Sequence, residues 1–203
     1  HENARQVLDI GSGTGLISLM LAQRHPHAEI TGIECDQNAY RQSRQNMTNS
    51  PWAERLTAID SDISNYFPST SFNLIVSNPP FFEANEQIAS ESRSLARQNS
   101  NLTPARIFEF SQKYLSEQGR LFLIYPYDKF DHTIEAGKNH YLQLHSVVYI
   151  RPNILKACKR VVMEFRHEKA YAVKSSILPV EVVRRHDYSW QYKQFTCPYY
   201  LHL

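Results

Sequence analysis

The sequence lacks the features of disulfide-stapled, zinc-binding and membrane-spanning proteins. Its three cysteines are far apart and form no CxxC pair, so neither a disulfide framework nor a zinc site is indicated. No apolar run approaches the ~20 residues that a transmembrane helix needs, and no signal peptide is visible. We therefore expect a cytoplasmic protein that has no metal ion and no membrane partner.

The chain also lacks a strong overall charge, because its formal net charge is only +2. This charge is unevenly distributed: residues 1–150 carry a net −4, whereas residues 151–203 hold ten Lys and Arg against four Asp and Glu, a net +6. A basic C-terminal quarter fits a polyanionic partner such as a nucleic acid. A solvated basic face without a partner accounts for the charge equally well.

Strand-like and helix-like segments alternate along the chain, which predicts a mostly parallel sheet covered by helices on both faces. The 203 residues fit a single α/β domain, 1–203. Because the first buried strand begins soon after His1, we expect a segment upstream of this sequence. The last two strands are expected to pair antiparallel at one edge of the sheet, before an irregular tail from residue 169. The expected strands are 6–10, 29–33, 56–59, 72–77, 120–125, 144–150 and 159–166, and the expected helices are 14–24, 37–49, 103–119 and 129–139.

Three of the six glycines lie in one short segment, Asp9–Gly15, which follows the first strand. Such a turn bends sharply and lets the backbone approach a ligand without Cβ clashes. Asp9 precedes it, where its carboxylate can orient the turn or contact a ligand ammonium group. This acidic position favours S-adenosylmethionine, which carries an amino-acid group, over a dinucleotide. The expected cofactor-binding residues of the turn are Asp9, Gly11, Ser12, Gly13 and Gly15.

Two further carboxylates follow the next two strands. Glu34 can accept hydrogen bonds from both ribose hydroxyls of an adenosine-containing cofactor. Asp62 can accept from the adenine amine, while the backbone of Ile63 meets the edge of the ring. Each residue alone also fits an ordinary tight turn or a surface acid. Their order at consecutive strand ends favours one cofactor pocket at the carboxyl edge of the sheet.

The segment Asn78-Pro79-Pro80-Phe81-Phe82 follows the buried strand 72–77 and is typical of methyl transfer to an amine conjugated with a planar group. The lone pair of adenine N6 is delocalised, so this nitrogen is a poor nucleophile. The Asn78 side-chain oxygen and the Pro79 carbonyl can each accept one N–H bond, which favours a tetrahedral amine whose lone pair faces the methyl donor. The prolines remove competing N–H donors, and the Phe81 ring offers a surface on which a base can stack.

These motifs resemble the class I S-adenosylmethionine-dependent methyltransferases, and more narrowly the tRNA1(Val) (adenine(37)-N6)-methyltransferase family. The resemblance implies a Rossmann-like fold with a seven-stranded, mostly parallel sheet whose last strand is antiparallel. It also implies N6-methylation of an adenine in the anticodon loop of a tRNA, where a base can be unstacked at modest cost. We expect a monomer. The resemblance is carried by VLDIGSGTGLISLMLAQR, Glu34, Asp62, SNPPFF, Ala96-Arg97 and the terminal CPYYL.

Other functions share the Asn-Pro-Pro-aromatic site and remain open. Guanine N2 methylation of ribosomal RNA is one, although such enzymes often continue with His-x-Gly, where this chain has Phe82-Glu83-Ala84. Glutamine N5 methylation of a release factor is another, although those enzymes usually carry an N-terminal helical domain. The third is an inactive methyltransferase fold that only binds RNA. Intact Asp9, Glu34 and Asn78 disfavour this last function.

A few residues carry weaker expectations. Cys35, beside Glu34, is expected to be small and buried, and Phe82 either lines the pocket or packs beneath the loop. One interpretation of the tail is a basic and stacking surface for RNA, formed by Arg184, Arg185, Lys193 and the tail aromatics. Packing of those aromatics in the core or at the sheet edge is the favoured alternative. Three arginines either contact RNA phosphates or are solvated: Arg93, Arg97 and Arg106.

Overall fold

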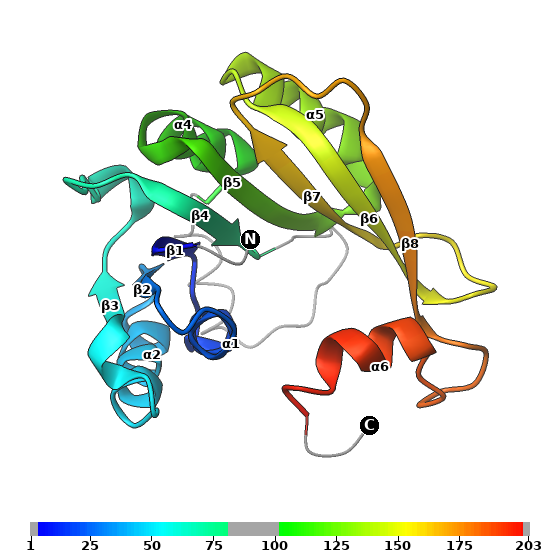
Figure 1. The fold of residues 1–203 in the computed structure, drawn as a ribbon, viewed down its shortest axis with the longest axis horizontal. Helices are drawn as coiled ribbons and strands as arrows, with labels where there is room; N and C mark the ends of the chain where they lie inside the picture. Colours follow the sequence, from blue (N-terminus) through cyan, green and yellow to red (C-terminus); the bar gives the residue numbers. More distant parts are fainter. Residues whose placement is uncertain (1–3, 81–101, 201–203) are drawn as a thin grey trace.

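An eight-stranded sheet organises the computed structural model, which describes residues 4–80 and 102–200 (Figure 1). The strand order is β3-β2-β1-β4-β5-β7-β6-β8. Every neighbouring pair is parallel except those made by β7, which runs antiparallel to both β5 and β6. The strands are β1 (Gln6–Ile10), β2 (Glu29–Glu34), β3 (Leu56–Asp60), β4 (Phe72–Ser77), β5 (Leu115–Pro126), β6 (Gln143–Asn153), β7 (Arg160–Arg166) and β8 (Lys174–Glu181).

Helices cover both faces of this sheet, as the alternation of elements predicts. The helix α1 packs its buried Ala22 against the β1 and β4 side chains of one face, whereas Phe108 of α4 packs on the other. Met47 of α2 lies close to Gly32 of β2, beside α1. The α-helices are α1 (Leu16–Arg24), α2 (Gln37–Thr48), α4 (Pro104–Tyr114), α5 (Phe130–Asn139) and α6 (Trp190–Thr196), and the short 3₁₀ turns are η1 (Ala53–Arg55), η2 (Ile63–Asn65) and η3 (Tyr127–Lys129).

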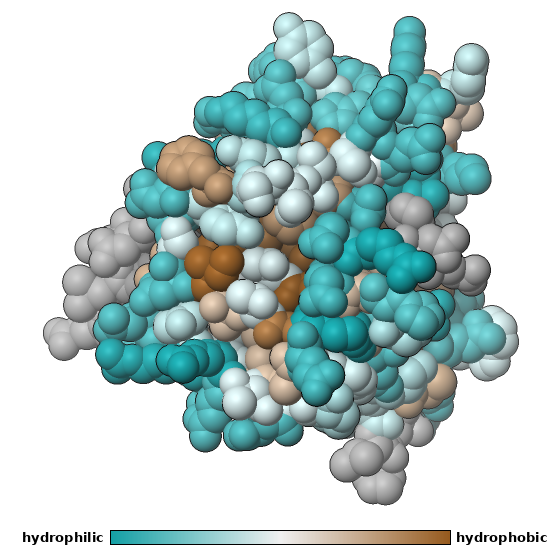
Figure 2. All heavy atoms as spheres, turned by 60° about the vertical axis from the view of Figure 1, so that its left-hand side comes forward, coloured by the Kyte–Doolittle hydropathy of each residue, from teal (hydrophilic) through white to brown (hydrophobic). Residues whose placement is uncertain are grey.

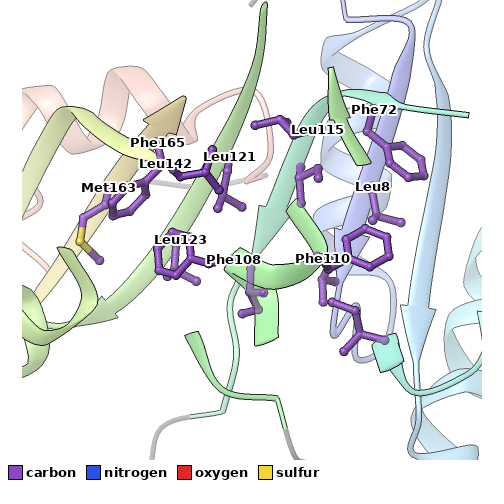
Figure 3. Close-up of a cluster of buried hydrophobic side chains, with 14 of the residues drawn as sticks. Leu8, Phe72, Phe108, Phe110, Leu115, Leu121, Leu123, Leu142, Met163 and Phe165 are labelled. Atoms are coloured by element: carbon purple, nitrogen blue, oxygen red, sulfur yellow. The ribbon is translucent and has the colours of Figure 1, made fainter. Parts of the chain in front are cut away.

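The larger core lies between the sheet and the pair α4 and α5 (Figure 3). Its side chains come from the central strands, whose alternate residues face this layer because successive residues of a strand point to opposite sides. Phe108 of α4 meets Phe165 of β7 edge to face, with ring centroids 4.8 Å apart. Leu8 and Phe72 pack at the far end of the same cluster. This continuous layer holds the central strands in register, and their carboxyl ends carry the motifs.

The sheet differs from the expected one beyond residue 169. The prediction of an irregular tail is wrong for two segments, which form β8 and α6. The sheet therefore has eight strands instead of the expected seven. The antiparallel strand is present as β7, but the final strand β8 runs parallel to β6 and takes the edge position. Sequence patterning misses β8 because its first four residues are all exposed, so no apolar alternation marks it.

The helix after the long loop is also shorter than expected. It begins as predicted, with Thr103 accepting from the Arg106 N–H and proline in the first turn, but it ends at Tyr114 instead of near Gly119. Leu115 adopts an extended backbone and pairs with Phe72 of β4. Pairing then resumes only at Arg120, so the intervening residues form an irregularity within β5. Tertiary pairing of Leu115 therefore overrides the helical pattern.

The surface brought forward in Figure 2 is mostly hydrophilic, with a small apolar patch recessed near its centre. Among the described residues, no helix is long and apolar enough to cross a membrane. Some large apolar side chains are exposed, and one example is Phe67, which is 77% exposed.

Replacing Phe108 with alanine tests the core. Phe108 is completely buried, so its loss leaves a cavity, and we expect the free energy of unfolding to fall by about 3–5 kcal/mol. Urea denaturation of the purified variant measures this change. Phe67→Ala removes the same atoms from an exposed position and should change the stability by less than about 0.5 kcal/mol. Equal effects of the two substitutions would contradict the assigned core.

Candidate functional site

The turn after β1 is held against the end of β2 by three backbone donors. The N–H groups of Gly11 and Ser12 both donate to the Ile33 carbonyl at 2.9 Å. The N–H of Gly13 donates to Oε2 of Glu34 at 2.8 Å. These bonds join the glycine turn to the neighbouring strand, and they place Glu34 beside the turn.

Two of the glycines have a left-handed backbone but differ in their surroundings. Gly11 has φ 70°, a conformation that favours glycine, and a Cβ there would lie 2.8 Å from Leu102 Cδ2, so the end of that side chain would have to shift. Gly13 has φ 57°, but an added Cβ would meet nothing within 4 Å. Gly13 therefore faces open space, which is the arrangement expected where a ligand approaches the backbone.

Asp9 lies beneath the turn and is completely buried. Its Oδ2 accepts a 2.7 Å hydrogen bond from the Ser18 hydroxyl of α1, whereas Oδ1 has no partner among the described residues. Burial raises the pKa of Asp9 from 3.8 to about 6, the Ser18 bonds oppose this shift, and the nearby charge of Glu34 adds to it. Asp9 thus orients the turn through α1, and it keeps one acceptor unused.

The Glu34 carboxylate bridges two backbone donors at the end of β2. In addition to the Gly13 bond, its Oε1 accepts from the Asp36 N–H at 2.8 Å. Asp36 in turn begins α2, since its side chain accepts from the Ala39 N–H. Each oxygen of Glu34 retains a further lone pair, because a carboxylate offers about four acceptor positions. The residue is therefore fixed in place and still able to accept bonds from a ligand.

Asp62 begins the turn η2 at the end of β3. Its Oδ1 accepts from the Ser64 N–H at 2.8 Å and lies 3.9 Å from Nη1 of Arg106. The same guanidinium donates to the Ser64 hydroxyl at 3.0 Å. Arg106, a candidate for phosphate contact, therefore braces the Asp62 loop. Ile63 is buried, with 7% of its surface exposed.

The segment after β4 lies at the same edge as the glycine turn. Ser77 pairs with Ile10 in the register of β4 and β1, and its hydroxyl donates to the Ile10 carbonyl at 2.8 Å. Asn78 follows directly and is exposed, Pro79 is buried, and Pro80 is exposed. The expected stacking residue Phe81 lies outside the described residues, as do Phe82, Arg93, Ala96 and Arg97.

One cavity of about 370 Å³ brings the predicted residues together, a size within the usual range of small-ligand sites. The glycine turn, the ends of β2 and β3 and the segment after β4 all contribute to its wall. Four predicted site residues are absent from this lining: Asp9, Ser12, Gly15 and Pro79. The lining residues are Ile10, Gly11, Gly13, Ile33, Glu34, Cys35, Asp36, Ser61, Asp62, Ile63, Asn78, Pro80 and Leu102.

The cavity also contains residues that sequence reasoning missed or misplaced. Cys35 was expected to be buried, but it is exposed at the cavity wall, because it follows the last residue of β2. Burial of part of its thiol raises the pKa, and the charges of Glu34 and then Asp62 raise it further. Leu102 comes from the far side of the long loop and contacts the position of Gly11. No local pattern in the sequence marks Leu102, since only folding brings it there.

The residues of the cavity wall, together with Asp9 and Ser12 next to it in the sequence, have a chemistry that fits S-adenosylmethionine. The uncommitted Oδ1 of Asp9 and the Oγ of Ser12 are buried and lack partners among the described residues, and such atoms are usually satisfied by a ligand or water. Glu34 and Asp62 present carboxylates to the cavity, and Ile33 and Ile63 present apolar surface for a ring. In the part of the chain that is described, no group of three or more His, Cys, Asp and Glu side chains is placed to hold a metal ion.

Solved structures share this architecture. A predicted O-methyltransferase from Agrobacterium tumefaciens superposes with a TM-score of 0.73 at 15% identity, covering 97% of this chain and 90% of that one. A TehB-like SAM-dependent methyltransferase from Corynebacterium glutamicum gives a TM-score of 0.56 at 19% identity, covering 81% and 80% of the two chains. Sheet order, glycine turn and cavity therefore define a Rossmann-like methyltransferase fold, which confirms the predicted fold class.

Sequence relatives narrow the assignment. The sequence model of the Methyltransferase small domain family matches residues 1–134. The tRNA1(Val) (adenine(37)-N6)-methyltransferase of Aeromonas hydrophila is 38% identical, over 98% of this chain and 84% of that protein. The protein of the same name from Bacteroides thetaiotaomicron is 34% identical, over all of this chain and 85% of that protein. The chain belongs to the tRNA1(Val) (adenine(37)-N6)-methyltransferase family.

The raised pKa of Asp9 predicts a specific pH dependence of stability. The folded protein holds this proton more tightly than the unfolded chain, so the associated stability is complete below pH 3.8 and is lost as the pH rises through about 6. The shift corresponds to about 3 kcal/mol. Asp9→Asn removes the titration, so the wild type should lose up to that amount relative to the variant between about pH 4 and pH 8.

Urea unfolding at several pH values, without cofactor, measures this difference. Asp60→Asn, at an exposed position at the end of β3, is the matched control and should follow the wild-type pH profile. If the difference between wild type and Asp9→Asn stays constant across this pH range, the buried carboxylate is not destabilising.

Proposed function

We propose that this protein transfers the methyl group of S-adenosylmethionine to N6 of adenine 37 in tRNA1(Val). The observation that carries the proposal is the shared cavity, which Gly13 and Asn78 both line although they come from different βα turns. The names of the relatives supply the substrate, and the geometry supplies a site in which a donor and a planar amine can meet. The fold and the cofactor follow from the family to which the chain belongs.

The cofactor half of the cavity is formed by the ends of β1, β2 and β3. When bound, S-adenosylmethionine supplies an electrophilic methyl group on a sulfonium. Glu34 accepts from the ribose hydroxyls through the lone pairs that its backbone bonds leave free. Asp62 accepts from the adenine amine, and Ile63 presents its backbone to the edge of the ring. Asp9 and Ser12 stabilise the amino-acid end from beneath the glycine turn.

The substrate half of the cavity begins at Asn78. Its side-chain oxygen and the Pro79 carbonyl accept the two N–H bonds of the target amine, so the nitrogen lone pair is directed toward the methyl group. Because the prolines carry no N–H, the backbone offers no donor that competes for these acceptors. The reaction depends on orientation and charge placement, and a general base with a tuned pKa is not needed.

A tRNA anticodon loop suits this site because its bases are single-stranded and can be unstacked into a pocket. Stacking of the base on Phe81 remains a prediction from the sequence, and so does a monomeric state. Asn78 is exposed at the carboxyl edge, where a nucleotide on a large RNA has access. If Asn78 were instead enclosed within the protein, only small substrates would reach it.

The proposal is tested with an unmodified tRNA1(Val) transcript and labelled cofactor. We expect N6-methyladenosine in the wild-type transcript and none in a transcript that carries guanine in place of adenine 37. Nucleoside analysis by mass spectrometry distinguishes the products. Methylguanosine in ribosomal RNA, label in a release factor or no transfer at all would overturn the proposal.

Asn78→Ala should abolish methyl transfer while the dissociation constant for S-adenosylmethionine stays within a few-fold of the wild-type value. The side-chain oxygen acts on the target amine and not on the fold, so kcat falls and cofactor binding does not. Single-turnover kinetics and calorimetry measure the two quantities. Asn139→Ala, at the exposed end of α5, should match the wild type in both. Retention of most activity in Asn78→Ala would rule out the assigned role.

Glu34→Gln should weaken cofactor binding by about tenfold to a hundredfold, as expected for hydrogen bonds to a charged group worth ~1.5–3 kcal/mol. The amide is neutral and cannot accept at both ends, so it also loses one of the bonds to Gly13 and Asp36. Isothermal calorimetry measures the change. Glu54→Gln, at an exposed position in η1, should leave the affinity unaltered. An unchanged dissociation constant in Glu34→Gln would place the ribose elsewhere.

A further inference from the structure

The carboxyl edge of the sheet extends beyond the cavity to β6 and β8. These two strands run in the same direction as β4 and β5, because β7 is antiparallel to both of its neighbours. The register confirms the alignment: Pro126 at the end of β5 pairs with Arg160, and Arg160 pairs with Ile150 near the end of β6. Residues that follow β6 and β8 therefore lie at the same edge as Asn78.

The loops after β6 and β8 lie side by side at this edge (Figure 1). The Ile154 N–H donates to the Val182 carbonyl at 3.2 Å. The Asn153 side-chain amide also reaches toward the Val183 carbonyl, at 3.4 Å. We call this surface the β6–β8 rim and define it as residues 151–160 and 181–188.

The rim concentrates positive charge. It holds six Lys and Arg against two acids, a net charge of +4 on 18 residues, whereas the whole chain carries +2. One carboxylate oxygen of Glu181 already has a hydrogen-bond partner, since its Oε1 accepts from the His186 N–H at 2.8 Å. The other acid is Asp187, whose N–H bonds to the Arg184 carbonyl. The basic residues are Arg151, Lys156, Lys159, Arg160, Arg184 and Arg185.

Arg184 and Arg185 are the most informative of these residues. Both are exposed, and neither forms an ion pair with another residue of the described segments. A pair of exposed guanidiniums on one short loop is suited to phosphate groups, to which arginine can bind through two parallel N–H bonds. The loop is fixed at both ends, because Val182 N–H bonds to the Asp187 carbonyl and Ser189 N–H to the Val180 carbonyl.

The distance between the rim and the cavity sets what the rim can contact. Four strand spacings separate β4 from β8 in the sheet order, so at ~4.8 Å each the Arg184 loop lies roughly 20 Å from Asn78. That separation exceeds the reach of a single unstacked nucleotide. A phosphate at the rim therefore belongs to a part of the RNA beyond the target base and its immediate neighbours.

We propose that the β6–β8 rim is the docking surface for backbone phosphates of the tRNA stem next to the loop that enters the cavity. The inference rests on the proposed function, because it assumes that the substrate is an RNA larger than its target loop. The rim also exposes four large apolar side chains, Ile154, Leu155, Val182 and Val183. Six basic side chains share the same two loops and give them a net charge of +4, and we assign the partner from this charge. The phosphate contacts position the RNA, and the cavity selects the base.

The test compares Arg184→Ala/Arg185→Ala with a matched pair, Lys169→Ala/Lys174→Ala. Lys169 and Lys174 are also exposed and lie in the same half of the chain. They are near the start of β8, however, and therefore at the end of the strand opposite to the rim. Fluorescence anisotropy measures the binding of unmodified tRNA over a range of salt concentrations, and it requires no turnover. A single-stranded oligonucleotide with only the loop sequence serves as the second ligand.

We expect the Arg184/Arg185 variant to bind tRNA about tenfold more weakly, and the slope of log K against log salt to fall in magnitude by roughly 1.5, since about two phosphate contacts are lost. Its affinity for the loop oligonucleotide and for S-adenosylmethionine should match that of the wild type. The KM for tRNA should rise while kcat is maintained. The lysine pair should alter none of these quantities.

The outcomes separate this inference from the proposed function. An unchanged tRNA affinity and salt slope in the Arg184/Arg185 variant overturn the rim assignment, even when the wild type produces N6-methyladenosine. They would instead indicate a protein partner for the exposed residues of the rim. Equal weakening for the loop oligonucleotide also overturns it, because the contact would then lie within the loop. Rim-dependent tRNA binding without methylation supports the rim and contradicts the proposed function.

Discussion

The hydrogen bonds from Gly11 and Ser12 to the Ile33 carbonyl are the constraint on which the site depends. They hold the turn after β1 against the end of β2, so the open face of Gly13 and the carboxylate of Glu34 form one wall. The main chain can follow this path only with positive φ at the glycines. The turn also sets where α1 begins, and therefore where Ser18 meets Asp9. A shift of this turn would displace the cofactor wall and its supporting helix together.

Burial of the Asp9 carboxylate beneath the turn destabilises the folded protein, and its explanation lies in ligand binding. Asp9 is buried with one oxygen unpartnered among the described residues, and its pKa is about 6. At neutral pH the protein holds a negative charge that burial disfavours. A ligand ammonium group would compensate this charge. Part of the unfavourable free energy of burying the carboxylate would then be regained when the ligand binds. Strain of this kind commonly lies at functional sites.

The sheet brings the local motifs together because it aligns the ends of strands from distant parts of the chain. The register of β1 with β4 brings Ser77 against Ile10 and places Asn78 across the cavity from the glycine turn. The same direction of β6 and β8 carries the basic rim to that edge. Donor site, acceptor site and positive surface therefore share one side of the molecule.

The sequence alone determined the strands β1 and β4, the glycine turn and the Asn-Pro-Pro motif, because each depends on local backbone requirements or on continuous burial. Glu34 and Asp62 line the cavity wall and also accept bonds from local backbone groups, and their roles toward the cofactor stay predictions. Tertiary structure alone decided the remaining features of the fold and the site.

Leu102 enters the cavity wall from beyond the long loop, and Cys35 is exposed there because β2 ends just before it. The strand β8 exists only because β6 offers an unpaired edge, since its exposed first half has no apolar period of its own. Likewise, α4 ends early because Leu115 gains a partner in Phe72, a contact between residues far apart in sequence that no local pattern encodes.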